Sequence, residues 1–205
     1  AASSSVEAAA SAEAPTEPVA TTIDVAWLPP TVDHWRADLE KNAVTYGVDA
    51  ELLAIVVLVE GGGDPAAKSP SGALGLMQIL PLTGRHIATE RKLKGHKSAL
   101  LGEPAYNLDF GAWYLSQQLG TFQVADDRAH TVDLAAAAYN AGPGKLARFL
   151  NAEEKLSSET ERYIRWVGGM WRERRAATSE TYGAWWRAGG SKLVDRAASA
   201  LKVDV

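Results

Sequence analysis

The chain of 205 residues is long enough for one domain, or for one domain with a short extension, since domains commonly contain about 100 to 150 residues. Its 46% apolar and 22% charged residues, with 18 glycines and 9 prolines, are typical of a globular protein and exclude a collagen-like or wholly disordered chain. The 21 basic and 25 acidic side chains give a formal charge of −4, and that excess lies entirely in the first 30 residues. The remainder is formally neutral, which argues against nucleic-acid binding because such binding needs an excess of lysine and arginine.

Cysteine and long apolar stretches are both missing from the sequence. Without cysteine the chain has no disulfide bond, thiol nucleophile or cysteine-bound metal. The longest strongly apolar run, Leu52 to Val59, is much shorter than the roughly 18 residues that a membrane-spanning helix requires, so we expect no membrane span. The chain begins at Ala1 and lacks a basic segment followed by an apolar one, so we expect any export signal to have been removed or never included.

The composition changes along the chain and divides it into three parts. Residues 1–28 are rich in Ala, Ser, Thr and Pro and have too few bulky apolar side chains to offset the cost of ordering them, so we expect a flexible leader or linker. The pair Pro29 and Pro30 then marks the start of the folded body, residues 29–180. We expect residues 181–205 to form a helical extension that packs on this body.

Helical signals dominate from Asp33 onward. The first expected helix runs from Asp33 to Tyr46, where Gly47 ends it. The next, residues 49–60, is apolar around its whole circumference, which indicates a helix that is buried on every side. Its β-branched residues would also suit a strand, but Asp49 can cap a helix start and the glycines at 61–63 can end it.

The remainder of the chain continues this helical pattern. A turn-rich loop at residues 61–72 and a short apolar piece at 73–80 precede a helix that Pro81 begins, and residues 92–106 look irregular. Further helices are expected at residues 107–119, 131–141, 145–150, 157–175 and 191–203, with breaks at 120, 142–144 and 189–190. The last helix places four apolar residues on one stripe, which indicates packing against the body: Leu193, Val194, Ala197 and Leu201. The sequence therefore predicts an all-α protein.

Glu60 directly follows eight apolar residues at the end of the expected helix over residues 49–60. Either its carboxyl group reaches water at the helix end, or it lies in partly apolar surroundings. In the second case burial and the negative end of the helix dipole, which contributes about 0.3 to 1 kcal/mol, both raise the pKa of the carboxyl group. A carboxylic acid that stays protonated near neutral pH is what general-acid cleavage of a glycosidic bond requires. Glu60 is therefore the candidate catalytic residue.

A second segment, residues 75–78, combines small residues with side chains that suit a sugar. The small residues let the backbone approach closely, Gln78 offers an amide, and Met77 offers a flexible apolar wall. Amide and apolar surface together suit an N-acetyl sugar, although Met and Leu at this spacing are also common in a protein core.

A third segment, residues 134–144, has four alanines that allow a neighbouring helix to come close, followed by Tyr139 and Asn140 at the helix end. If Tyr139 meets Glu60, its hydroxyl group would partner a buried carboxyl group whose unpaired burial costs about 1 to 3 kcal/mol. In the alternative, Tyr139 is a core residue and Asn140 a helix cap.

The order of these segments is more specific than any one of them. Glu60 and a Gly- and Pro-containing loop are followed by SPSGALGLMQILP, then AAYNAGPG, then ETERYI. This order resembles the soluble Slt-type lytic transglycosylases of family 1, whose catalytic domain has a goose-type lysozyme-like fold, and the likeness covers about residues 48–167. In that family the glutamate is usually followed by a serine that helps to orient it, whereas this chain has Gly61.

The resemblance also implies roles for individual residues. Glu60 would be the single catalytic acid and base, and Tyr139 would support it. Four residues would bind substrate in the cleft: Met77, Gln78, Asn140 and Tyr163. The helix at residues 107–115 would be structural.

The implied reaction is cleavage of the bond between N-acetylmuramic acid and N-acetylglucosamine in peptidoglycan, with formation of 1,6-anhydro-muramoyl ends. Ordinary glycosidases use two carboxyl groups, about 5 to 9.5 Å apart, and neither Asp49 nor Asp64 has a spacing that makes it the second one. A one-carboxyl mechanism therefore fits better. Two alternatives remain open: a goose-type-lysozyme-like hydrolase of the same bond, and a non-catalytic peptidoglycan-binding scaffold, which the departure at Gly61 keeps in view.

No cofactor or metal is expected, because the histidines at 34, 86, 96 and 130 show no metal-ligand spacing. The resemblance implies glycan strands of peptidoglycan as the partner, a monomer, and a location in the bacterial periplasm or outside the cell. Another protein of the cell envelope is a possible partner that the sequence does not identify.

Overall fold

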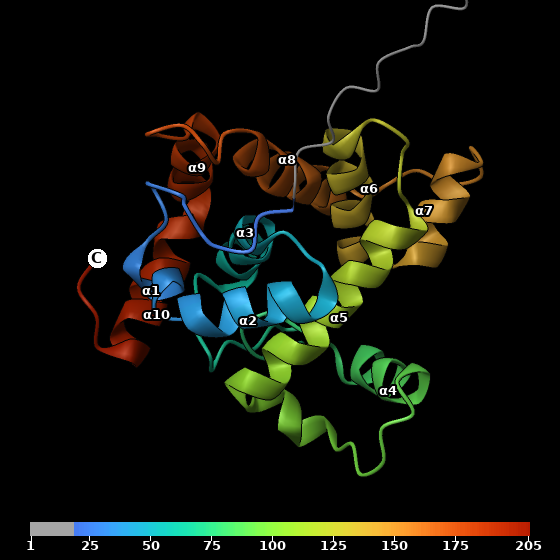
Figure 1. Ribbon diagram of the computed structural model, residues 1–205, viewed down its shortest axis with the longest axis horizontal. Coiled ribbons are helices and arrows are strands. Elements are labelled where there is room, and N and C mark those ends of the chain that lie inside the picture. Colours follow the sequence, from blue (N-terminus) through green and yellow to red (C-terminus); the bar gives the residue numbers. More distant parts are fainter. Residues whose placement is uncertain (1–18) are drawn as a thin grey trace, which may run out of the picture.

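The computed structural model describes residues 19–205, and this part of the chain is helical (Figure 1). Its helices are α1 (Pro30–Asp33), α2 (Arg36–Tyr46), α3 (Ala50–Gly61), α4 (Pro81–Glu90), α5 (Pro104–Thr121), α6 (Arg128–Ala141), α7 (Pro143–Leu150), α8 (Ser158–Arg172), α9 (Glu180–Trp185) and α10 (Ser191–Leu201). A 3₁₀ turn at Ser98–Gly102 precedes α5. Extended pairing in the described residues is limited to isolated bridges from Leu74 to Lys68 and Ile79. The all-α prediction is confirmed.

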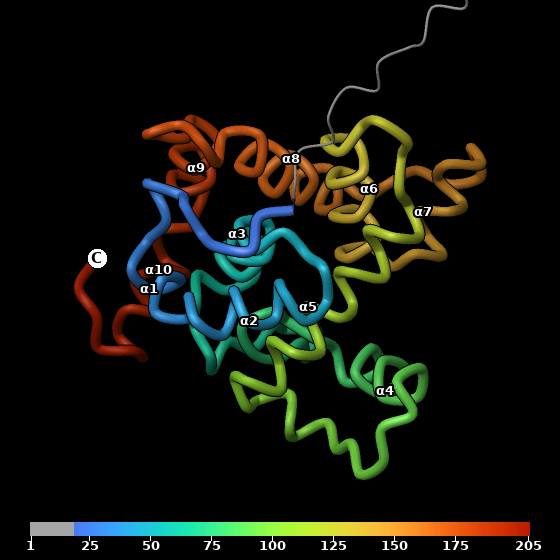
Figure 2. Tube along the Cα trace, in the orientation of Figure 1, coloured from blue at the N-terminus to red at the C-terminus, as the bar shows by residue number. Residues whose placement is uncertain are grey.

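Helix α3 forms the centre of the molecule, and its side chains from Ala50 to Leu58 are all buried. Helices α2 and α8 make its most extensive contacts, and α1 and α10 also pack on it, so the helix is enclosed as Figures 1 and 2 show. Asp49 caps its start by accepting hydrogen bonds from the Glu51 and Leu52 amides at 3.0 and 3.1 Å. Gly62 ends it in the left-handed conformation, with a φ of 66°. The predicted buried helix is confirmed and the strand alternative is wrong.

Two groups of helices surround this centre. Helices α5, α6 and α8 pack consecutively, with α6 and α8 in the closest association, and α7 continues from α6. Helix α4 and the loop after it form a lobe that joins the rest through the 3₁₀ turn and α5, at the lower right of Figure 1. At the other side α10 packs on α1 and α3 and buries Val194 and Ala197 completely.

The expected leader at residues 1–28 is too long. Residues 1–18 lie outside the described part, but Ile23 and Val25 belong to the core, with only 4% and 7% of their surface exposed. The Ala50 amide donates a hydrogen bond to the Ala20 carbonyl group at 2.8 Å, which ties this segment to the start of α3. A few apolar side chains and backbone hydrogen bonds to distant residues are enough to order residues 20–28, and neither signal is visible in the local composition.

Several helix boundaries also differ from the expectation. The helix expected from Asp33 to Tyr46 is interrupted at His34 and Trp35, and α5 runs through Gly120. Helix α8 ends at Arg172 rather than at residue 175, and α9 lies in the region of the expected C-terminal helical extension, where the sequence predicts bounds only for the last helix. Among residues 19–205, no helix combines the length and apolar content needed to cross a membrane.

Candidate active site

Glu60 lies at the C-terminal end of α3, where the buried helix meets a cavity of about 190 Å³. The helix is buried as far as Leu58, whereas Val59 and Glu60 are partly exposed. The walls come from the loop before α4 and from α4, α5, α6 and α8, and they include Ser69, Ser71, Gln78, Thr83, Tyr114, Tyr139, Asn140 and Glu159. The structure thus brings Glu60 together with Gln78 and Asn140, as the sequence predicts.

The hydroxyl group of Tyr163, on α8, donates a hydrogen bond to Glu60 Oε1 at 2.6 Å. Burial raises the pKa of Glu60 to about 7; the hydrogen bond from Tyr163 acts in the opposite direction, and the nearby carboxylate of Glu159 raises the pKa again. A substantial fraction of Glu60 is therefore protonated at neutral pH. This is the state in which a carboxyl group can act as a general acid.

Tyr139 does not make the predicted hydrogen bond to Glu60. Its hydroxyl group donates instead to the Met77 carbonyl oxygen at 2.8 Å, and its ring lies against that of Tyr114, with 5.4 Å between the centroids. Tyr139 still forms part of the cavity wall. The prediction was wrong in its choice of tyrosine, because Tyr163 on α8 takes the place next to the carboxyl group.

Met77 is the other predicted residue that the structure places differently. Its side chain is fully buried and packs so closely on Gly111 that a Cβ there would lie 2.2 Å from the Met77 sulfur. The expectation that the Met77 side chain lines a sugar subsite is therefore wrong. Its backbone has a structural role, since its amide donates to Asn107 Oδ1 at 2.8 Å and its carbonyl oxygen accepts the bond from Tyr139.

Asn107, on α5, fixes the loop that forms one wall of the cavity. It is fully buried, and its side-chain amide donates to the carbonyl groups of Leu74 and Leu101 at 2.7 and 2.8 Å. Gly75 is required beside it, because a Cβ at this position would lie 2.5 Å from Asn107 Nδ2 and the φ of Gly75 is 74°.

Gln78 and Asn140 each have one polar group engaged in the protein and another that faces the cavity. The Gln78 side-chain amide donates to the Gly75 and Ala67 carbonyl groups at 2.9 and 3.1 Å, and these bonds hold a backbone with a φ of 47°. Such left-handed backbone costs a non-glycine residue about 1 to 2 kcal/mol. Asn140 Oδ1 accepts from Thr160 at 2.8 Å. The Gln78 oxygen and the Asn140 amide thus remain for a ligand.

Sequence analysis missed several residues of the cavity, of which Glu159 is chemically the most important. Glu159 precedes Thr160 at the exposed start of α8, where it looks like an ordinary residue of a first helical turn. Ser69 and Ser71 were hidden within a turn-rich loop, and their hydroxyl groups are hydrogen-bonded to each other at 2.8 Å. Tyr114 lies in a helix that the sequence analysis took to be structural. Only the packing of these segments around Glu60 gives them a place in the cavity.

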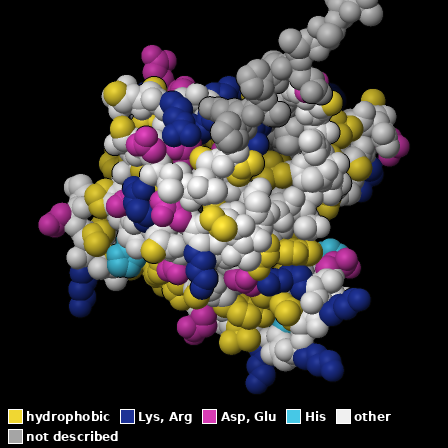
Figure 3. Space-filling model, viewed as in Figure 1, with side chains coloured by type: hydrophobic (Ala, Val, Ile, Leu, Met, Phe, Trp, Pro, Cys, Tyr) yellow, Lys and Arg dark blue, Asp and Glu magenta, His cyan; other side chains and the backbone are white. Residues whose placement is uncertain are grey.

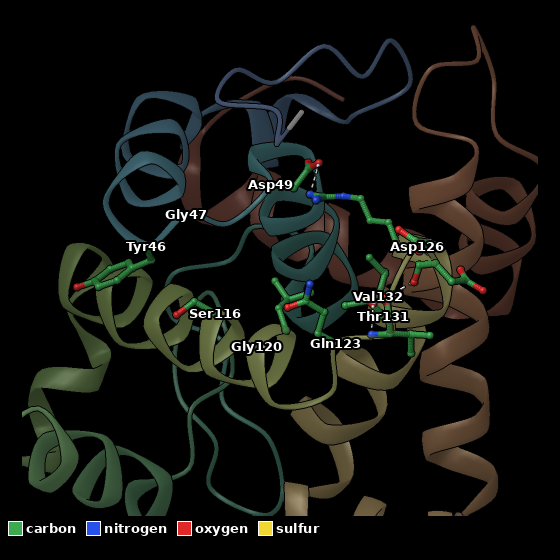
Figure 4. Close-up of a pocket in the computed structure, with 13 residues that line it drawn as sticks. Tyr46, Gly47, Asp49, Ser116, Gly120, Gln123, Asp126, Thr131 and Val132 are labelled. Carbon is green, nitrogen blue, oxygen red and sulfur yellow. Dashed lines mark hydrogen bonds and ion pairs between the residues drawn. The ribbon is translucent and has the colours of Figure 1, made fainter. Parts of the chain in front are cut away.

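A larger hollow of about 320 Å³ lies at the opposite end of α3, between α2, α5 and α6 (Figure 4). Its buried carboxyl group, Asp49, already accepts two amide hydrogen bonds from α3 and pairs with Arg128 at 3.3 Å. Within residues 19–205, no cluster of histidine and acidic side chains is arranged to hold a metal ion.

Comparison with known proteins agrees with this geometry. Residues 39–161, which extend from α2 to the start of α8 and include Glu60, match the family described as the transglycosylase SLT domain. The chain belongs to this family. Among curated relatives of the SLT domain, it is similar to the endo-type membrane-bound lytic murein transglycosylase A of Klebsiella pneumoniae, with 40% identity over 85 residues that cover 40% of this chain and 42% of the relative.

Other relatives agree on the family and on the fold. The membrane-bound lytic murein transglycosylase C of Photorhabdus laumondii is 31% identical over 59% of this chain and 35% of its own length. The lytic transglycosylase Slt of Pseudomonas aeruginosa superposes with a TM-score of 0.52 and 25% identity, over 78% of this chain and 24% of the other. The 70 kDa soluble lytic transglycosylase of Escherichia coli, at 22% identity and a TM-score of 0.51, supports the predicted fold alone. The chain spans less than half the length of each of these proteins.

Proposed function

We propose that this protein is a lytic transglycosylase that cleaves the bond between N-acetylmuramic acid and N-acetylglucosamine in peptidoglycan. The observation that carries the proposal is the position of Glu60 in a cavity of a transglycosylase SLT domain, where Tyr163 holds its carboxyl group and burial raises its pKa to about 7. Its relatives are named as lytic murein transglycosylases. The substrate places the protein in the periplasm or outside the bacterial cell, and a cavity built by a single chain is compatible with a monomer.

In the proposed reaction Glu60 acts first as the acid and then as the base. The protonated carboxyl group donates its proton to the glycosidic oxygen, and the bond from this oxygen to the muramoyl anomeric carbon breaks. The N-acetyl group of the substrate stabilises the positive charge on that carbon. The Glu60 carboxylate then takes the proton from the muramoyl 6-hydroxyl group, whose oxygen bonds to the anomeric carbon. One bond breaks, one forms, and no water is consumed.

Other residues of the cavity have supporting roles in this proposal. Tyr163 holds the Glu60 carboxyl group in one orientation through its 2.6 Å hydrogen bond. The free oxygen of Gln78 and the free amide of Asn140 are suited to the N-acetyl and hydroxyl groups of a sugar. Tyr114 and Tyr139 offer aromatic surface to the sugar rings.

Glu159 gives a specific reason to test a second function, hydrolysis of the same bond. It is a second carboxylate in the cavity that contains Glu60, and inverting glycosidases use a second carboxylate to activate water. Glu159 is exposed to solvent, whereas a general base works best when it is held in place and shielded. Family membership and this exposure together favour the transglycosylase.

The test is digestion of purified sacculi in heavy-oxygen water, followed by mass spectrometry of the released muropeptides. We expect anhydro-muramoyl ends without incorporated heavy oxygen. Hydrated, labelled reducing ends would reject the transglycosylase in favour of the hydrolase, and E159Q should then abolish their formation.

The variant E60Q provides the control for this digestion, because it keeps the shape of the side chain and removes the acid. We expect the rate to fall by about a thousandfold, within the range of 10² to 10⁴ that general acid–base catalysis contributes. If wild-type protein binds sacculi but releases no muropeptides, the protein is a scaffold that has kept the groove and lost turnover.

A further inference from the structure

A group of exposed basic side chains lies on α4 and on the loop that follows it. This basic patch consists of Arg85, Lys92, Lys94 and Lys97. None of the ion pairs in the described part of the chain includes them, whereas the neighbouring Arg91 is neutralised by Asp109 at 2.6 Å. Figure 3 shows Lys and Arg side chains gathered over this lobe, at the lower right of the view.

The patch is a local excess of positive charge on a body that is formally neutral. Glu90 is the only acidic residue between positions 85 and 102, a stretch that also contains Arg91. An excess of one sign on one lobe produces a field that attracts anionic ligands and raises the rate of their association.

Helix α4 connects this patch to the Glu60 cavity. Its start contributes Thr83 to the cavity, and Thr83, His86 and Glu90 line an adjoining hollow of about 360 Å³. Thr83 and Tyr114 line both the hollow and the cavity, so the two lie next to each other. A helix of ten residues spans about 15 Å, and the loop with the three lysines begins where it ends. A chain that leaves the cavity along α4 therefore passes the patch.

We propose that the basic patch binds the carboxylate groups of peptide stems on a peptidoglycan strand that runs from the Glu60 cavity along α4. This inference rests on the proposed function, because that function supplies the strand. N-acetylglucosamine carries no charge, and the carboxyl group of N-acetylmuramic acid is consumed in its bond to the stem, so the anionic groups of a stem-bearing strand lie on its stems. The protein therefore prefers strands that bear peptide stems to an uncharged glycan such as chitin.

The experiment measures binding in the E60Q background, so that turnover does not affect the result. Two charge-reversal triples are compared: K92E/K94E/K97E in the patch, and K41E/K192E/R196E as a matched control on exposed positions of α2 and α10. Each protein is sedimented with intact sacculi and with particulate chitin, an uncharged polymer of N-acetylglucosamine. We expect the patch triple to weaken binding to intact sacculi by about tenfold at low salt, in line with the usual scale of electrostatic steering.

The same triple should change binding to chitin by less than about twofold, and its effect on intact sacculi should shrink in about 0.5 M salt, where the charges are screened. The control triple should bind both materials as E60Q does. Equal losses on both materials, or no loss on intact sacculi, overturn the proposal. So does an unchanged affinity for sacculi together with lost binding to phosphatidylglycerol vesicles, which would assign the patch to a lipid surface. Failure of wild-type protein to cleave sacculi counts against the proposed function alone, since the binding assay needs no cleavage.

Discussion

Helix α3 carries a shielded carboxyl group near each end, and the two differ in their partners. Glu51, in the first turn, has no exposed surface and lies 2.8 Å from Arg175 Nη1 and 3.1 Å from Arg174 Nε. It also accepts a hydrogen bond from the Asp24 amide at 3.1 Å. Glu60, at the last turn, has a hydroxyl group as its hydrogen-bond partner and no ion pair within the described residues.

This difference in partners distinguishes Glu51, to which we assign a structural role, from Glu60, the proposed catalytic acid. At the start of α3 the helix dipole and two arginines favour the anion, and they oppose the rise in the pKa of Glu51 that burial causes. At the end of α3 burial raises the pKa of Glu60 to about 7; the hydrogen bond from Tyr163 acts against this rise and the carboxylate of Glu159 adds to it. Burial raises the pKa of both residues, and at Glu51 a backbone amide and two arginines oppose the rise, whereas at Glu60 the Tyr163 hydroxyl group does.

The strongest test of this comparison removes the charge of Glu51 with E51Q. The substitution leaves the buried Arg174 facing a neutral amide, and breaking one side of a buried pair costs about 3 to 5 kcal/mol. We expect the free energy of unfolding in urea to fall by about this amount, while the activity of the folded protein on sacculi persists. The control is E154Q, in an exposed pair with Arg148, where the loss should stay below about 1 kcal/mol. A loss at Glu51 as small as at Glu154 would contradict the structural role.

The second test is E60Q, which we expect to raise the free energy of unfolding, whereas E51Q lowers it. Because the pKa of Glu60 in the folded state, about 7, lies above its ordinary value of 4.5, folding favours the protonated form. The resulting stability is complete below pH 4.5, decreases as the pH rises towards 7, and is lost above 7. The glutamine of E60Q does not ionise, so the variant keeps this stability at high pH. At pH 8 it should be more stable than wild type by on the order of 2 to 3 kcal/mol.

Urea unfolding of both proteins at pH 8 and pH 4.5 measures this difference. The gain from E60Q should be small at pH 4.5, where wild-type Glu60 is protonated in the folded state and about half protonated in the unfolded state. An equal gain at both values of pH would mean that packing, and not ionisation, separates the two proteins.

The bounds of α3 and the position of Glu60 could be predicted from the sequence, because both depend on local signals. Asp49 and the glycines after Gly61 mark the ends of α3, and the unbroken apolar run places Glu60 next to the core. The fold and the position of the acid follow from this pattern. The partners of the acids do not, because they come from segments that are distant in the chain.

Tyr139 and Tyr163 illustrate the limit of prediction from the sequence. Both lie close to the ends of their motifs, Tyr163 buried and Tyr139 half-buried, but the packing of α6 and α8 places only the hydroxyl group of Tyr163 on the Glu60 carboxyl oxygen. The segment at residues 20–28 illustrates the same limit, since its order depends on contacts with Glu40 and Glu51 that composition does not reveal.

A third test separates the two tyrosines. Y163F removes a hydrogen bond that lowers the pKa of Glu60, so this pKa should rise above 7. Activity requires protonated Glu60, so the loss of kcat/KM on the alkaline side should move to higher pH, while kcat falls by about tenfold as one hydrogen bond is lost. Y139F instead removes the bond to the Met77 carbonyl oxygen and should lower stability by about 1 kcal/mol without moving the pH profile. A shift of the profile in Y139F rather than in Y163F would reverse their assigned roles.

The smallest expected effect concerns Gly61, the position at which this chain departs from the family pattern. Gly61 is helical, and a Cβ there would lie 3.2 Å from the Ala67 Cβ, so a small side chain needs only a slight adjustment. A better helix propensity, roughly 0.5 to 1 kcal/mol, offsets this crowding, and G61S should change the free energy of unfolding by less than about 1 kcal/mol.

The matched variant G61A isolates the hydroxyl group from the added Cβ. If a serine at this position helps to orient Glu60, G61S should turn over sacculi a few times faster than G61A, on the scale of one hydrogen bond worth about 1 kcal/mol. Equal rates would mean that Tyr163 already fixes the carboxyl group. At the end of α3, one uncharged partner would then be enough to position Glu60. At the start of the helix, two arginines and a backbone amide hold Glu51.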